Sequence, residues 1–157
     1  DVMEAAGRTE NAERLIAAPA GRVFGCWTDP ALLVRWLPPE GTEGRTEAFD
    51  PRPGGAFKIV LTYLDPEEPG KSGGGEDVIA GAFVAVDPPC HLAFVSRFCS
   101  DAPNLQGEMR MDWHFDPEPE ATTRVRIVAS NVPPGIAPED HAAGMASSLA
   151  QLAALIE

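Results

Sequence analysis

The chain ends in the stretch PEDHAAGMASSLAQLAALIE, residues 138–157, around which we expect the remaining sequence to be organised. It contains no Asp, Glu, Lys or Arg between His141 and Ile156, although the whole chain carries 24 acidic residues. Large apolar residues recur at the spacing of one helical face, namely Met145, Leu149, Leu152 and Ile156. The stretch therefore predicts a C-terminal helix that is buried on most of its circumference.

The start and the second side of this helix carry further signals. Pro138 suits a first helical turn because it has no N–H to leave unpaired, and Glu139 and Asp140 bring negative charge to the positive end of the helix dipole. The opposite side is filled by Ala143, Ala146, Ala150 and Ala153. If a sheet covers only the large apolar side, other short helices or a second copy of the chain must cover the alanines, so a homodimer is one predicted assembly.

Length and charge limit the protein class. With 157 residues, one domain spanning residues 1–157 is expected, large enough to bury one sizeable core. The 12 basic and 24 acidic residues give a net charge of −12, which disfavours nucleic acid and anionic membranes as partners. No apolar run approaches the length of a membrane span.

The cysteines indicate a compartment. Cys26, Cys90 and Cys99 are an odd number without a CxxC pair, which disfavours a disulfide framework. No signal-like segment opens the given sequence, so we expect a cytoplasmic protein. Because the first residue is Asp1, a preceding segment is left open.

The N-terminal third predicts a strand followed by two short helices. We expect Asp1–Asn11 to fray, Ala12–Ala17 to form a strand and Pro19–Trp27 to form a helix. Asp29 can accept N–H groups of the next helix, Pro30–Trp36, which starts with proline.

From Gly41 onward the pattern has a period of two, which is typical of strands. Predicted strands are Phe57–Tyr63, Val78–Val86, His91–Phe98, Met109–Phe115 and Thr122–Ala129. Short strands separated by hairpin-length breaks predict an antiparallel meander with one wet face, and the C-terminal helix is expected to cover the other. The fold class is therefore α+β.

The acidic segment Pro66–Glu76 interrupts the strands, and its Gly and Pro content predicts a mobile loop. Within it, Gly70-Lys71-Ser72 imitates the end of a phosphate-binding loop, but Asp65 stands where that motif requires its first glycine. We therefore expect no nucleotide, and no cofactor of any other kind.

The three histidines, His91, His114 and His141, lie far apart in the sequence, so we expect no metal site. His114 and Asp112 form either an acid and base pair or a solvated charge pattern on the wet face, and the pattern favours the second. His141 lies one turn before Met145, where it would either reach solvent or bind a ligand or act as a base in a cavity.

An apolar set gives the strongest functional signal. Its members are Trp36, Phe57, Tyr63, Phe94, Met109, Met111, Trp113, Met145 and Leu149. Methionines beside a tryptophan form a soft wall suited to a ligand cavity, although the same residues could simply fill a core. A curved sheet over one helix tends to leave space between the two, so we predict a ligand-binding site formed by this set together with His141.

Several motifs in fixed order resemble one superfamily. They are Ile16-Ala17-Ala18-Pro19 with Val23-Phe24, Thr28-Asp29-Pro30, Trp36, Asp50-Pro51-Arg52-Pro53-Gly54-Gly55, Asp87-Pro88-Pro89 with Leu92, Thr123-Arg124-Val125, and the helix from Gly144 to Leu155. From about Leu15 onward the chain resembles the START-like superfamily with the Bet v 1 or helix-grip fold. Within it the chain is most similar to the bacterial group related to the C-terminal domain of the activator of Hsp90 ATPase.

The resemblance implies a strand, two short helices, six further antiparallel strands and a long C-terminal helix gripped by the curved sheet. It also implies a cavity for an apolar molecule between helix and sheet, and it identifies no catalytic residue. The leading hypothesis is a non-enzymatic binder of a small apolar ligand. The alternatives are a cyclase or dehydratase with His141 as base, and a co-chaperone or protein-interaction module.

Overall fold

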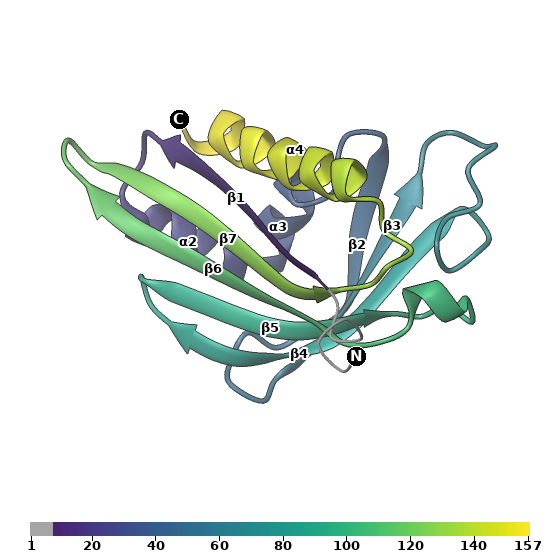
Figure 1. Ribbon diagram of the computed structural model, residues 1–157. Helices are drawn as coiled ribbons and strands as arrows, with labels where there is room; N and C mark the ends of the chain where they lie inside the picture. Colours follow the sequence, from purple (N-terminus) through teal and green to yellow (C-terminus); the bar gives the residue numbers. More distant parts are fainter. Residues whose placement is uncertain (1–7) are drawn as a thin grey trace.

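The computed structural model describes residues 8–157, and its strands form one curved antiparallel sheet in the order β1-β7-β6-β5-β4-β3-β2 (Figure 1). The strands are β1 (Arg8–Ile16), β2 (Thr42–Phe49), β3 (Ala56–Tyr63), β4 (Glu76–Asp87), β5 (His91–Phe98), β6 (Met109–Glu118) and β7 (Thr122–Val132). The helices are α2 (Ala20–Thr28), α3 (Pro30–Trp36), the short 3₁₀ helix η1 (Pro103–Leu105) and α4 (Pro138–Ile156). This is the predicted α+β helix-grip architecture, with two short helices after the first strand.

The first strand starts earlier than the sequence predicted. Arg8 to Asn11 belong to β1, whose residues pair with β7 from Arg8 opposite Val132 to Ile16 opposite Thr123. The expected fraying is therefore wrong for residues 8–11, because pairing with β7 satisfies backbone groups of a segment whose side chains are mostly polar. The remainder of the predicted frayed segment, residues 1–7, lies outside the described part.

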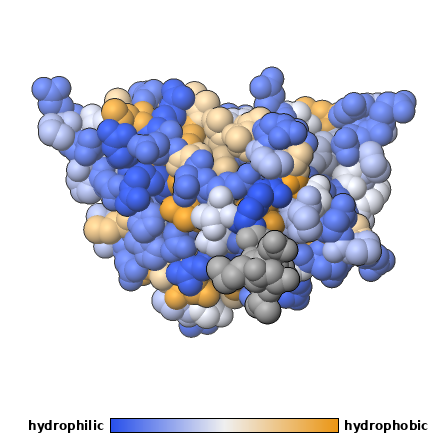
Figure 2. Space-filling model, in the orientation of Figure 1, coloured by the Kyte–Doolittle hydropathy of each residue, from blue (hydrophilic) through white to orange (hydrophobic). Residues whose placement is uncertain are grey.

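Helix α4 lies across the concave side of the sheet and contacts β1 and α3 (Figure 1). Its buried residues are Met145, Ser148, Leu149, Leu152, Ala153 and Ile156. The prediction that most of its circumference is buried is wrong: Ala143, Ala146 and Ala150 are exposed. Figure 2 shows weakly apolar surface in the region of this helix. Alanine tolerates water because it is small and has the best helix propensity, so a helix without charges need not be buried all round.

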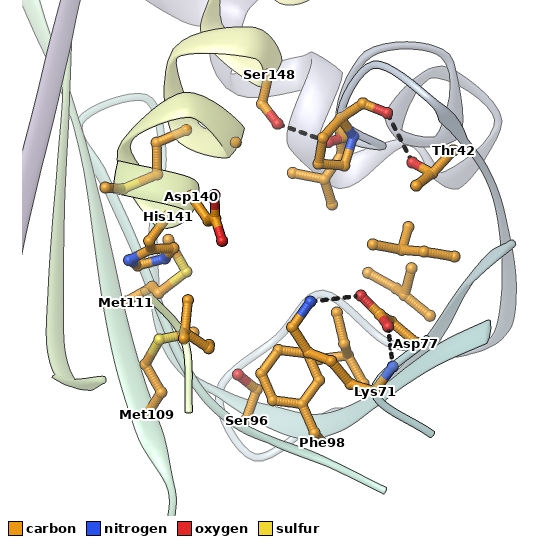
Figure 3. Close-up of a pocket in the computed structure, with 18 of the residues that line it drawn as sticks. Thr42, Lys71, Asp77, Ser96, Phe98, Met109, Met111, Asp140, His141 and Ser148 are labelled. Carbon is orange, nitrogen blue, oxygen red and sulfur yellow. Dashed lines mark hydrogen bonds and ion pairs between the residues drawn. The ribbon is translucent and has the colours of Figure 1, made fainter. Parts of the chain in front are cut away.

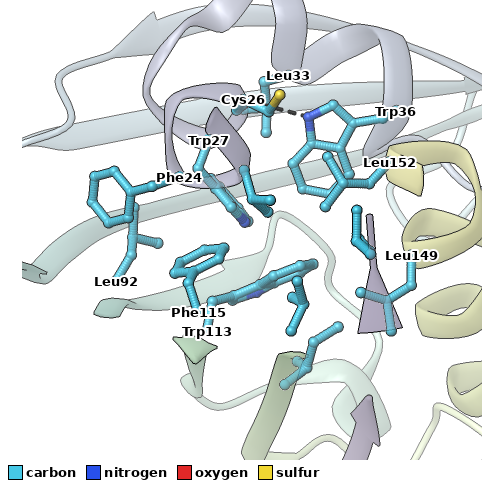
Figure 4. Packing of buried hydrophobic residues seen from close by; sticks show 14 of the residues in the cluster. Phe24, Cys26, Trp27, Leu33, Trp36, Leu92, Trp113, Phe115, Leu149 and Leu152 are labelled. Carbon is cyan, nitrogen blue, oxygen red and sulfur yellow. Dashed lines mark hydrogen bonds between the residues drawn. The ribbon is translucent and has the colours of Figure 1, made fainter. Parts of the chain in front are cut away.

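A side-chain hydrogen bond joins the two short helices and satisfies a carbonyl that Pro30 leaves without a helical donor. Pro30 has no N–H, so the carbonyl of Cys26 at the end of α2 cannot be satisfied by continuing that helix. Trp36 Nε1 of α3 donates to this carbonyl at 3.1 Å (Figure 4). Asp29 caps α3, as predicted, by accepting from Ala31 N at 3.0 Å.

The core between the two short helices and the sheet is aromatic. Trp27 makes edge contacts with Trp36 and Trp113, at centroid distances of 5.6 Å and 5.2 Å, and all three indoles are at most 2% exposed (Figure 4). Edge contacts of this kind add roughly 0.5–1.5 kcal/mol each beyond area burial. The burial of Trp113 confirms the strand register expected for β6.

Within residues 8–157, no helix is long and apolar enough to cross a membrane.

Candidate functional site

A pocket of about 980 Å³ lies between α4 and the sheet (Figure 3). Strands β3, β5 and β6 supply its apolar floor, and the first half of α4 supplies one side. The segment between β3 and β4 closes the other side, through Glu68 and Lys71. The volume matches that of small-molecule sites in proteins, which span roughly 300–1,000 Å³.

Most of the predicted site residues line this pocket. They are Phe57, Tyr63, Phe94, Met109, Met111, Trp113, His141 and Met145. Trp36 and Leu149 do not line it, because both are packed in the core at 0% and 2% exposure. The spacing of four along α4 correctly put Leu149 on the face of Met145, but the pocket extends only along the first turns of the helix.

Several lining residues are not among the predicted site residues, and the most informative of these are Trp27, Lys71, Asp77 and Ser96. Trp27 ends the predicted helix Pro19–Trp27, and its position there does not indicate contact with a pocket. Lys71 lies in the segment Pro66–Glu76, whose Gly and Pro content predicts a mobile loop and gives no indication of a place in a pocket wall. Asp77 directly follows the end of that segment, and no sequence signal marked it as buried.

A polar cluster forms one wall of the pocket. The Asp77 carboxylate, with 5% of its side chain exposed, accepts from Lys71 Nζ at 3.0 Å and from the Tyr63 hydroxyl at 2.7 Å. Burial alone would lower the pKa of Lys71, but the hydrogen bond and charge of Asp77 outweigh it and the pKa is raised. Burial, assisted by Asp77, raises the pKa of Tyr63, so the phenol keeps its proton. The cluster is a salt bridge with a phenol donor.

His141 lies on the opposite side of the pocket, beside Met109 and Met111 (Figure 3). It does not simply reach solvent: 13% of its side chain is exposed and its Nδ1 lies 2.7 Å from Glu10 Oε1. Burial would raise the pKa of Glu10, but hydrogen bonds from His141 and Arg8 outweigh it and the pKa is lowered. A carboxylate at Nδ1 fixes the ring orientation, as a carboxylate does for catalytic histidines.

The remaining histidines meet on the outer face of the sheet. His91 and His114 are far apart in the sequence, but they lie opposite each other on β5 and β6 and stack at a centroid distance of 4.8 Å. Their ring nitrogens and the Asp112 carboxylate come within 4.8 Å of one another and could hold a metal ion. Strand pairing brings them together across a separation that sequence spacing does not reveal.

The Asp112 carboxylate is bonded to two neighbouring side chains. It accepts from Arg110 at 2.9 Å and lies 2.8 Å from His91 Nε2, which puts it in a surface charge network, the reading that the sequence favoured over an acid and base pair. Burial, Arg126 and His91 lower the pKa of His114, whereas for His91 the bonds to Asp112 and Asp87 outweigh burial and raise the pKa.

Comparisons with known proteins agree with the observed fold. Protein CV1439 from Chromobacterium violaceum is 31% identical, with a TM-score of 0.83 over 95% of this chain and 96% of that one. The AHSA1 protein from Silicibacter pomeroyi is 21% identical, with a TM-score of 0.76 over 94% and 96% of the two chains, and is similar in fold. A search of curated proteins found no match. The family model for the Activator of Hsp90 ATPase homolog 1-like protein matches residues 17–157. The chain therefore belongs to this family, in the START-like superfamily.

Proposed function

We propose that this protein binds a small, largely apolar molecule in the pocket between α4 and the sheet, and that it does so in the cytoplasm. The observation that supports binding is the wall of Met109, Met111 and Phe94 facing a volume of about 980 Å³. Members of the superfamily typically bind ligands. All three cysteines lie in the described part and are free thiols, which is consistent with a reducing compartment.

The test uses N-phenylnaphthylamine, a neutral dye that fluoresces in apolar surroundings. We expect saturable binding with an affinity in roughly the micromolar range, near −8 kcal/mol. Met111→Trp, at a half-buried methionine on the pocket wall, should fill the space and abolish binding while the protein stays folded.

The matched control is Val84→Trp, because Val84 is 41% exposed on β4 and does not line the pocket. This variant should bind the dye as the unmodified protein does. Absence of dye binding to the unmodified protein, or binding that survives Met111→Trp, would refute a ligand pocket.

An enzyme of the cyclase or dehydratase kind is the second candidate, and the His141–Glu10 pair is the observation that favours it. In this case His141 would act as base while Glu10 holds its other nitrogen. His141→Ala should then keep dye binding and lose turnover of a candidate polyketide substrate. Retained turnover would exclude His141 as the base.

A protein-interaction module receives less support. The exposed large apolar side chains within residues 8–157 are Leu15, Leu64 and Val84. They lie on β1, after β3 and on β4, and β1 is not adjacent to either of these strands in the sheet. Leu64 and Val84 lie at opposite ends of the β3–β4 pair, where Thr62 is opposite Glu76 and Ala56 is opposite Ala82, so the three side chains do not form a continuous patch of the kind that marks a docking surface.

A further inference from the structure

We propose that the pocket selects a neutral amphiphile, whose carbonyl or hydroxyl oxygen accepts a hydrogen bond from Lys71, and that it rejects carboxylates. This inference rests on the proposed function and names the class of ligand. The donor belongs to the segment Gly70-Lys71-Ser72, whose sequence imitates the end of a phosphate-binding loop.

The three residues form a turn that delivers Lys71 into the pocket. Gly70 has φ +74, and a Cβ there would lie 2.3 Å from the carbonyl oxygen of Glu76, so only glycine fits. Ser72 Oγ accepts from Val78 N at 2.8 Å, and Lys71 N donates to Asp77 Oδ1 at 2.6 Å. The Lys71 backbone and the Ser72 side chain are thus both hydrogen-bonded to the start of β4. The turn has a structural role rather than a nucleotide-binding one.

The ammonium group of Lys71 retains a donor for a ligand. Two of its contacts are to oxygens, Asp77 Oδ2 at 3.0 Å and the Tyr63 hydroxyl at 3.3 Å. An ammonium has three protons, and this one faces the pocket, with its nitrogen 5.4 Å from the centroid of the Phe98 ring (Figure 3). The third proton is therefore available to a ligand oxygen.

The carboxylate beside it offers no corresponding acceptor. Asp77 Oδ1 accepts from Lys71 N, and Oδ2 accepts from both Lys71 Nζ and the Tyr63 hydroxyl. Only 5% of this side chain is exposed. The polar wall therefore favours a ligand that accepts a hydrogen bond over one that only donates.

The charge around the pocket excludes an anion. Asp77 already neutralises Lys71, and the other charged residues of the described lining are Glu40, Glu68 and Asp140 against Arg97. Figure 3 shows Asp140 directed into the pocket, across from Lys71. A carboxylate ligand would lose hydration and meet an excess of like charge, inside a chain of net charge −12, and the lining cation that has no carboxylate partner, Arg97, is exposed to solvent. A neutral oxygen avoids this cost.

The experiment compares decanol, a decanone and decanoate as competitors of N-phenylnaphthylamine at neutral pH. These share a chain length and differ in the head group. We expect decanol and the decanone to bind about tenfold more tightly than decanoate. Equal or tighter binding of decanoate would overturn the inference while leaving the binding function intact, whereas failure of the dye itself to bind would remove both.

Two variants locate the effect. Lys71→Met should weaken the binding of decanol and the decanone about tenfold more than it weakens the binding of the dye, whereas Lys58→Met, at a half-buried lysine paired with Glu47 outside the pocket, should leave all these affinities unchanged. Asp77→Asn leaves the charge of Lys71 uncompensated, so decanoate should bind about tenfold more tightly than to the unmodified protein. A loosened loop would not produce a gain confined to the carboxylate, so an unchanged decanoate affinity in a folded Asp77→Asn variant would contradict the proposal.

Discussion

The three tryptophans of the aromatic core differ in whether the indole nitrogen makes a hydrogen bond. The indole nitrogens of Trp27 and Trp113 are buried without a hydrogen-bond partner among the described residues. Trp36 Nε1, in contrast, satisfies the Cys26 carbonyl. The same substitution should therefore have different costs at two equally buried tryptophans.

Trp113→Ala should lower the free energy of unfolding by about 3–5 kcal/mol, because it empties a site that is 2% exposed. Trp113→Phe should cost less, since its nitrogen has no hydrogen bond to lose. Trp36→Phe should lower the free energy of unfolding by about 1–3 kcal/mol more than Trp113→Phe, because it leaves the buried Cys26 carbonyl without its hydrogen bond. Urea unfolding of the three variants measures this, and equal costs for the two phenylalanine variants would disprove the role of the Trp36 bond.

His91 should make the stability depend on pH. Its pKa is raised above the ordinary value of 6.5 because Asp112 and Asp87 outweigh burial. A raised pKa in the folded state means that the stabilisation is complete below 6.5 and is lost as the pH rises through the folded value. His91→Gln should therefore be more destabilising at mildly acidic than at alkaline pH.

Unfolding of His91→Gln and of the unmodified protein across this range provides the comparison. His114→Gln is the control of opposite sign, because the pKa of His114 is lowered and its burial opposes protonation. As the pH falls, the stability of His114→Gln should rise relative to that of the unmodified protein. A pH-independent difference for His91→Gln would show that its pairing with the two carboxylates contributes nothing.

At the scale of elements, α4 holds the end of α3 through side-chain bonds. Pro38 and Pro39 end α3 and leave carbonyls that no helical N–H can satisfy. Gln151 Nε2 donates to the carbonyls of Trp36 and Pro38 at 2.8 Å and 2.7 Å, and Ser148 Oγ donates to that of Leu37 at 2.6 Å. These bonds join helices that are separated by more than a hundred residues.

Gln151→Glu should therefore lower the free energy of unfolding by about 1–3 kcal/mol, since a carboxylate cannot donate to either carbonyl. Ala150→Glu adds the same charge at the neighbouring, exposed position of α4, and its effect should stay within about 0.5 kcal/mol. Thermal or urea unfolding compares the two, and similar costs would assign the effect to charge rather than to the lost bonds.

The segment Pro66–Glu76 remains predicted to be mobile, but the structure fixes its Lys71 half to Asp77 and Val78. Limited proteolysis with a Glu-specific protease should therefore cut at Glu67 or Glu68, before the anchored turn, rather than at Glu76. Resistance of both sites while other exposed glutamates are cut would contradict the predicted mobility.

For the whole molecule, a homodimer through the alanine side of α4 stays a prediction. Ala143, Ala146 and Ala150 are exposed in the single chain, so a partner is not needed to complete the core. If the dimer forms, the sedimentation coefficient should rise with protein concentration, and Ala146→Glu should remove the rise without changing stability. A concentration-independent monomer would rule the dimer out.

The sequence by itself determined the order and type of the elements apart from β2 and η1, for which its patterns predicted no range. Helix α3 matches its predicted bounds, since Asp29, Pro30 and the prolines after Trp36 are local signals whose effect does not depend on distant residues. The alternation in β6 likewise put Met109, Met111 and Trp113 on the pocket side, because a period of two fixes which face a side chain occupies.

Only the tertiary structure decided the chemistry of the site. Lys71 belongs to a segment without periodicity and Asp77 to the start of β4, and the geometry of the turn rather than its composition directs the ammonium group into the pocket. The pairing of His141 with Glu10 joins positions 131 residues apart, and the meeting of His91 with His114 depends on the register of β5 and β6. Local patterns indicate which face of each element is buried. Contacts between elements depend on how distant segments pack together, and a short stretch of sequence does not determine this.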